Sequence, residues 1–156
     1  MRYFDIRFGM YSVDSSCGKL RYKPVVLDRV MEALAVLTQL SGWTVAAFIY
    51  TENGNIDKDT IIGLIVSLLL FFMFLTSSYA PADKIHFPVR INRNNIARQY
   101  TFALRLIRFI NIFVGILFSV GILSQMYSWA AIAKSVIMVV MFLGILVYYI
   151  VAFMNR

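Results

Sequence analysis

The sequence is poor in residues that build disulfides, metal sites and catalytic centres. Its 156 residues include one cysteine, Cys17, and one histidine, His86. A single cysteine excludes an internal disulfide, a cysteine-rich zinc site and an iron–sulfur cluster held by this chain alone, and a single histidine excludes a bis-histidine haem. The sequence also lacks a phosphate-binding glycine loop and a nucleophile-elbow serine. We therefore expect a protein that is not an enzyme and uses no cofactor.

Acidic side chains are also scarce, with 8 Asp and Glu against 15 Lys and Arg, which leaves a net charge of +7. Such a balance can indicate nucleic-acid binding. However, 60% of the residues are hydrophobic, against about 45–50% in an average soluble domain. The basic residues of so apolar a chain are expected to face anionic lipid headgroups. We therefore predict a membrane protein with no nucleic-acid partner.

Four segments are long and apolar enough to span a bilayer. About 20 residues are needed, because a rise of about 1.5 Å per residue must cross roughly 30 Å of hydrocarbon. The segments are residues 30–50, 60–80, 101–123 and 129–154. The prediction is an all-α membrane protein with four transmembrane helices, in which residues 25–156 form one transmembrane domain.

The distribution of Lys and Arg predicts the orientation of the helices. Of the 15 basic residues, only Lys58 and Lys134 fall on one side of the predicted membrane. Lys and Arg accumulate on the cytoplasmic side of membrane proteins. Both termini are therefore predicted to lie in the cytoplasm.

Residues 1–24 form a cytoplasmic tail in this scheme. In the stretch YFDIRFGMY, apolar residues alternate with other residues, and VDSSCGK supplies turn residues. This pattern is typical of a β-hairpin. A flexible tail is the alternative that the sequence leaves open.

The third helix is predicted to begin on the cytoplasmic side, before the membrane. Asn92 is a suitable N-cap, Asn95 occupies the third helical position, and apolar residues recur at helical spacing from Ile96 onward. The helix is therefore expected to be continuous from a cytoplasmic extension into the bilayer.

Basic side chains gather along this helix. At 100° per residue, Arg98, Arg105 and Arg108 fall within about 80° of one another, and Arg93 precedes them. Long arginine side chains can reach lipid phosphates and hold a helix at a fixed depth. We expect all four to contact lipid headgroups or another anion; general anchoring and a specific anion site both remain open.

Polar residues deep in the predicted spans are few. Gln39 lies nine residues from the start of the first span, and Asn111 lies ten from the start of the third. These two helices run in the same direction, so the amides are expected at similar depth. We predict an interhelical hydrogen bond between them, worth about 1 kcal/mol. Glu32 lies only about one turn inside its span and not near the midplane, where a proton-coupled exporter would need a carboxylate.

The stretch FPVRINRNNIARQYTFALRLIRFI resembles a signature of small bacterial membrane proteins that carry the domain of unknown function 1648. In that family a second helix leads into a Pro-Val-x-Ile stretch, an Asn, an Arg-Gln-Tyr and a basic third helix. The likeness spans about residues 27–123. However, the loop between the first and second predicted spans keeps only Gly54 and Asp57 of the family's pattern. The matching positions are Pro88, Val89, Ile91, Asn95, Arg98, Gln99, Tyr100 and Arg105.

This resemblance implies a bacterial inner (plasma) membrane protein. Through kinship with the immunity protein against the sporulation-delaying toxin, it also implies self-protection against a membrane-active toxin. Two other roles stay open: an accessory or scaffold subunit of a larger membrane complex, and a small transporter. Anionic lipids on the cytoplasmic side are the expected partners, with a protein partner or a homo-oligomer as further alternatives.

Overall fold

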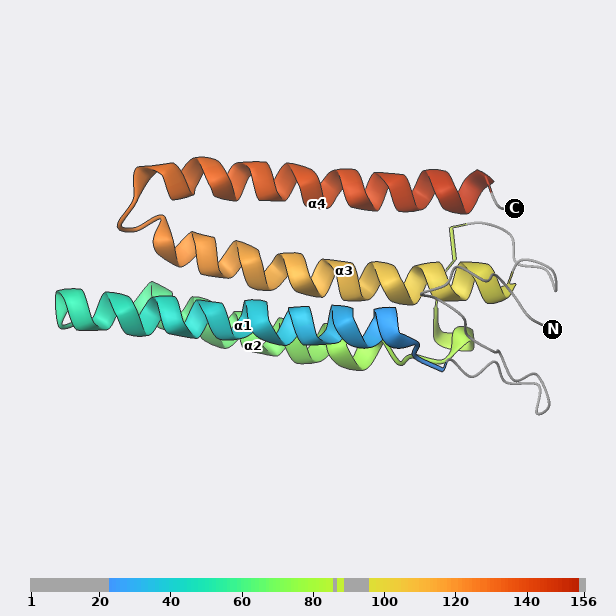
Figure 1. The fold of residues 1–156 in the computed structure, drawn as a ribbon, viewed down its shortest axis with the longest axis horizontal. Coiled ribbons are helices and arrows are strands. Elements are labelled where there is room, and N and C mark those ends of the chain that lie inside the picture. Colours follow the sequence, from blue (N-terminus) through green and yellow to red (C-terminus); the bar gives the residue numbers. More distant parts are fainter. Residues whose placement is uncertain (1–22, 86, 89–95, 155–156) are drawn as a thin grey trace.

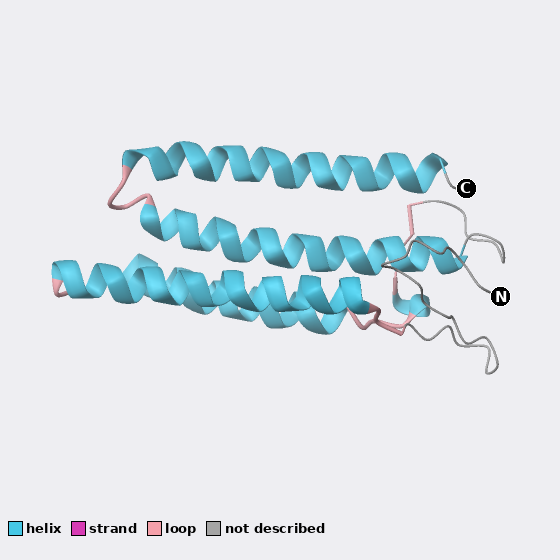
Figure 2. Cartoon of the chain, in the orientation of Figure 1, coloured by secondary structure: helices cyan, strands magenta, loops and turns pink. Residues whose placement is uncertain are grey.

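The structure is a computed structural model that describes residues 23–85, 87–88 and 96–154. Four long helices follow one another with short connections, and all of the described residues are helical or lie in turns and loops (Figures 1 and 2). A short 3-10 helix, η1 (Ala82–Lys84), follows the second of them. The long helices are α1 (Val26–Asn53), α2 (Lys58–Ser77), α3 (Ile96–Leu123) and α4 (Ser128–Met154).

All four long helices are long and apolar enough to cross a membrane. The expected all-α, four-helix membrane protein is thus confirmed at the level of its helices. Helix α3 begins at Ile96, five residues before the predicted span. The expected cap at Asn92, its neighbour Asn95 and the alternating tail segment lie outside the described residues.

Local sequence explains where α1 begins and ends. At its start, the Val25 backbone N–H donates to Asp28 Oδ2 at 2.9 Å, which satisfies one amide that has no partner inside the helix. At its end, Gly54 adopts φ +67° and its N–H donates to the Tyr50 carbonyl at 2.9 Å. Glycine is suited to this left-handed position because it has no Cβ.

Helix α3 is the centre of the bundle. It packs against α1, α2 and α4, and Figure 1 shows it between α4 on one side and the α1–α2 pair on the other. Helices α1 and α3 run parallel in a constant register, as shown by three hydrogen bonds between their side chains that join residues 76–78 positions apart. These pairs are Glu32–Arg108, Asp28–Arg105 and Ser41–Ser119.

Two glycines allow close packing on α3. A Cβ added to Gly115 would lie 2.5 Å from Thr38 Oγ1, and one added to Gly144 would lie 2.5 Å from the Phe109 ring. Each glycine therefore fits where a side chain would collide with the neighbouring helix, as is common between membrane helices. Gly115 thus allows close contact between α1 and α3, and Gly144 allows close contact between α4 and α3.

Candidate functional site

Two ion pairs join α1 to α3 near the N-terminal ends of both helices. Asp28 and Glu32 lie one turn apart, so both acids are on the same face of α1. Arg105 and Arg108 lie three positions apart, so both arginines are on the same face of α3. Arg105 Nε lies 3.2 Å from Asp28 Oδ1, and Arg108 Nε lies 3.1 Å from Glu32 Oε1. We call these four residues the charged cluster, and this end of the bundle the charged end.

The cluster is largely withdrawn from solvent. Asp28 is 0% exposed and Arg108 is 2% exposed, while the Glu32 side chain retains 13%. Ionised groups lose much hydration on burial, and opposite charges in hydrogen-bonding geometry offset that loss. Each carboxylate in this cluster therefore depends on the guanidinium that faces it from the other helix.

Tyr79 extends the cluster to the turn that follows α2. Its hydroxyl donates to Glu32 Oε1 at 2.6 Å, and the guanidinium carbon of Arg108 lies 5.3 Å from the centre of its ring. Arg29 Nη1 donates to Glu32 Oε2 and to the Tyr79 hydroxyl, both at 3.1 Å. Partial burial, followed by the hydrogen bond to Glu32, raises the pKa of Tyr79. The phenol is thus kept protonated as a donor, and Glu32 ties three segments together.

These contacts show that Arg108 does not make the lipid contact expected for it, and that Arg105 has a partner inside the bundle. Both side chains turn toward acidic residues of α1, and Arg108 is too buried to reach lipid phosphate. The physical reason is that carboxylates on a parallel neighbouring helix lie at the same axial level. Arg98 is partly exposed, so its lipid contact stays a prediction, and Arg93 lies outside the described residues.

Gln39 and Asn111 do not form the expected hydrogen bond with each other. Gln39 Oε1 accepts from Ser67 Oγ at 2.8 Å, and Asn111 Nδ2 donates to the Phe71 carbonyl at 3.4 Å. The two amides are 72 positions apart, whereas the register of α1 and α3 pairs residues about 77 positions apart. Gln39 therefore lies about 7 Å further along the bundle than Asn111. Each amide instead forms a hydrogen bond with α2, Gln39 from α1 and Asn111 from α3.

The residues of the sequence signature hold segments onto α3. Gln99 Nε2 donates to the Ala152 carbonyl at 2.9 Å, and Tyr100 donates from its hydroxyl to the Ala80 carbonyl at 2.8 Å. Both side chains are almost wholly buried. Gln99 thus attaches the end of α4, and Tyr100 attaches the turn after α2. Pro88 is half-buried, and Asn95 lies outside the described residues.

Asp28 and Tyr79 are members of the site that the sequence analysis did not single out. A signal for Asp28 was present, because two acids spaced by four residues open the first helix and two arginines spaced by three lie in the early turns of the third. That pattern is typical of pairing between parallel helices. Tyr79 carried no comparable signal, since a tyrosine after a membrane helix is common at interfaces.

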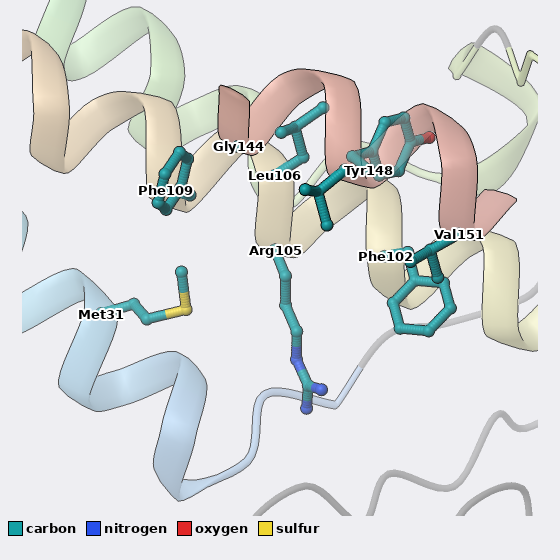
Figure 3. Close-up of a pocket in the computed structure, with 9 residues that line it drawn as sticks. Met31, Phe102, Arg105, Leu106, Phe109, Gly144, Tyr148 and Val151 are labelled. Atoms are coloured by element: carbon teal, nitrogen blue, oxygen red, sulfur yellow. The ribbon is translucent and has the colours of Figure 1, made fainter. Parts of the chain in front are cut away.

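An apolar groove lies beside the charged cluster, and we call it the lateral groove (Figure 3). It has a volume of about 390 Å³ and is lined by side chains of α1, α3 and α4, including Met31, Phe102, Phe109, Val147 and Val151. Arg105 also lines it, and Figure 3 shows this side chain extending from α3 toward the start of α1. The groove is therefore apolar along most of its wall and basic at one point.

In the part of the chain that the structure describes, no group of three or more His, Cys, Asp or Glu residues is arranged to hold a metal ion. Comparisons with protein-family models, curated proteins and solved structures find no match for this chain. The resemblance to the 1648 domain therefore stays a prediction from the sequence.

Proposed function

We propose that this chain is a non-enzymatic, multi-pass protein of the bacterial inner membrane that protects its own cell against a membrane-active toxin. The observation that carries the proposal is the internal pairing of the charged cluster, in which Arg105 meets Asp28 and Arg108 meets Glu32. These charges need no second subunit to neutralise them. Such a bundle is suited to standing alone in the membrane, as a self-protection protein must.

The placement of acidic residues supports binding over transport. In the four long helices, the carboxylates lie within the first two turns or at the last turn, at Asp28, Glu32, Glu52 and Asp59. Ion- and proton-coupled transporters generally place ionisable groups along a path near the middle of the bilayer. We therefore assign the chain a binding role, with the sequence resemblance supporting a toxin as the target.

The distribution of charge supports cytoplasmic termini. Among the described residues, the charged end carries six Lys and Arg against three Asp and Glu, while the opposite end carries two against three. The positive-inside tendency then favours the charged end as the cytoplasmic one. In this orientation the basic side chains meet the anionic cytoplasmic leaflet.

A second role, that of an accessory subunit, is favoured by the face of α4. Only Ala130 and Ala152 of this helix are buried, whereas large apolar residues such as Phe142 and Leu146 are exposed. Lipid tails can cover such a face, and so can a helix of a partner protein. The two roles differ in whether a foreign chain accompanies the protein.

Two measurements test the proposal together. Native mass spectrometry of the protein, released gently from its own cells, should detect the chain alone or with copies of itself. Expression in a strain that is sensitive to the sporulation-delaying toxin and lacks its immunity protein should restore growth in the presence of that toxin. If the mass spectrum shows a foreign chain at fixed stoichiometry and the toxin-sensitive strain is not protected, self-protection is contradicted and the accessory role is favoured.

A further inference from the structure

The lateral groove has the dimensions of a ligand site. Its volume of about 390 Å³ falls near the lower end of the range for small-molecule pockets, roughly 300–1,000 Å³. An α-helix with its side chains is about 10–12 Å across and needs a wider trough. A single flexible hydrocarbon chain suits a space of this size and apolar lining.

The position of the groove favours an occupant that comes from the bilayer. Helices α1 and α4 each lie along α3, and the groove runs between them at the charged end. Its α4 wall is formed by residues such as Val147, which is 55% exposed. In a membrane this face meets lipid tails. An acyl chain can therefore enter sideways without passing through the bundle.

Charge at the groove indicates which lipid would be retained. Arg105 uses Nε to pair with Asp28, and its side chain keeps 17% of its surface exposed. A guanidinium is a good donor to phosphate oxygens. The surrounding end of the bundle also has an excess of basic residues. An anionic headgroup at the groove would meet the exposed part of this side chain and offset the local excess of positive charge.

We propose that the lateral groove binds one acyl chain of an anionic phospholipid whose phosphate accepts a hydrogen bond from Arg105. The chain lies along the wall formed by Phe102, Phe109 and Val147, and the headgroup remains at the charged end. Arg105 thus has two roles, pairing with Asp28 inside the bundle and contacting lipid at its surface. The inference needs only a bilayer around the helices and is independent of any protective role.

Lipid titration of the purified full chain in detergent micelles tests the headgroup contact, with native mass spectrometry as the readout. Phosphatidylglycerol should bind with one-to-one stoichiometry and about tenfold more tightly than phosphatidylcholine with the same acyl chains. Both lipids offer a phosphate acceptor, but the ammonium group of choline offsets that charge and is repelled by Arg105, whereas phosphatidylglycerol keeps a net negative charge. The double variant Asp28→Asn/Arg105→Gln should lose this preference. It keeps the net charge of the pair at zero, so the loss would report the guanidinium itself. Equal binding of the two lipids, or an unchanged preference in the double variant, would overturn the proposal.

A matched pair of α4 variants tests the acyl chain. Val147 lines the groove, whereas Val139 is similarly exposed on the same helix outside it. Val147→Trp should weaken phosphatidylglycerol binding about tenfold, and Val139→Trp should leave it unchanged. Equal effects of the two substitutions would place the lipid elsewhere. Soluble glycerol phosphate should fail to compete, and competition at similar concentration would show an anion site that needs no chain.

Discussion

Arg108 of α3 donates to Glu32 of α1, although the two residues are 76 positions apart in the chain. The bond lies inside the α1–α3 interface, and Tyr79 brings the turn after α2 to the same carboxylate. One acidic side chain thus fixes the relative positions of three segments at the charged end.

Arg108→Leu should lower the free energy of unfolding by about 3 kcal/mol, because it leaves the Glu32 carboxylate without its buried partner. Glu32→Leu should cost a similar amount, and the double variant should cost clearly less than the sum. Denaturant titration of the protein in micelles measures all three. Additive effects of the two substitutions would contradict direct coupling between the side chains.

Tyr79→Phe should change how stability depends on pH. Because the folded-state pKa of Tyr79 is raised, the protonated phenol stabilises the fold fully below its ordinary pKa of 10.0. This contribution is lost as the pH rises through the raised value. The wild-type protein should therefore lose stability in that alkaline window, and Tyr79→Phe should lose less. Tyr127→Phe, at the opposite end of the bundle, is the control and should behave like the wild type.

Gly115→Ala should destabilise the bundle by about 1–3 kcal/mol, because its Cβ would collide with Thr38. Gly121→Ala on the same helix is the matched control. The nearest atom to its added Cβ, Lys134 Cδ, lies 4.0 Å away, so this substitution should be neutral or should stabilise the helix by up to about 1 kcal/mol. Thermal unfolding in micelles compares them, and equal losses of stability would refute the packing argument.

Gln99→Leu should loosen the C-terminal end of α4, since it leaves the Ala152 carbonyl without the donor that Gln99 supplies. Hydrogen exchange measured by mass spectrometry should rise near Ala152 and stay unchanged in the middle of α1. Tyr100→Phe removes a different bond on the same helix and should affect the turn near Ala80 instead. Increased exchange throughout the bundle in both variants would argue against these local attachments.

A reporter enzyme that is active only in the cytoplasm should be active when fused after Arg156. The expected reason is the excess of basic residues at the charged end. A fusion within the α1–α2 turn, after Gly54, should be inactive and provides the internal control. The reverse pattern would invert the proposed orientation.

The number and extent of the helices could be predicted because long apolar runs bounded by polar turns leave few alternatives. The pairing of Asp28 with Arg105 could not, because it depends on how far α1 and α3 slide along each other. The expected bond between Gln39 and Asn111 shows the difficulty, since it assumed that both helices start at the same level. Close packing of Gly115 on Thr38 sets the actual register, and a single sequence does not state which small residue meets which neighbour.

The distance along the chain between the charged partners has a consequence for biosynthesis. Helix α1 leaves the ribosome with Asp28 and Glu32 long before Arg105 and Arg108 have been made, since 76–77 positions separate each pair. Both acids lie near the beginning of α1, so water at the membrane surface can hydrate them during the delay. We expect the arrival of α3 to replace that water with guanidinium groups and to hold the first two helices in their final places. Helix α4 follows last in the chain, so we expect it to pack onto three helices that are already joined.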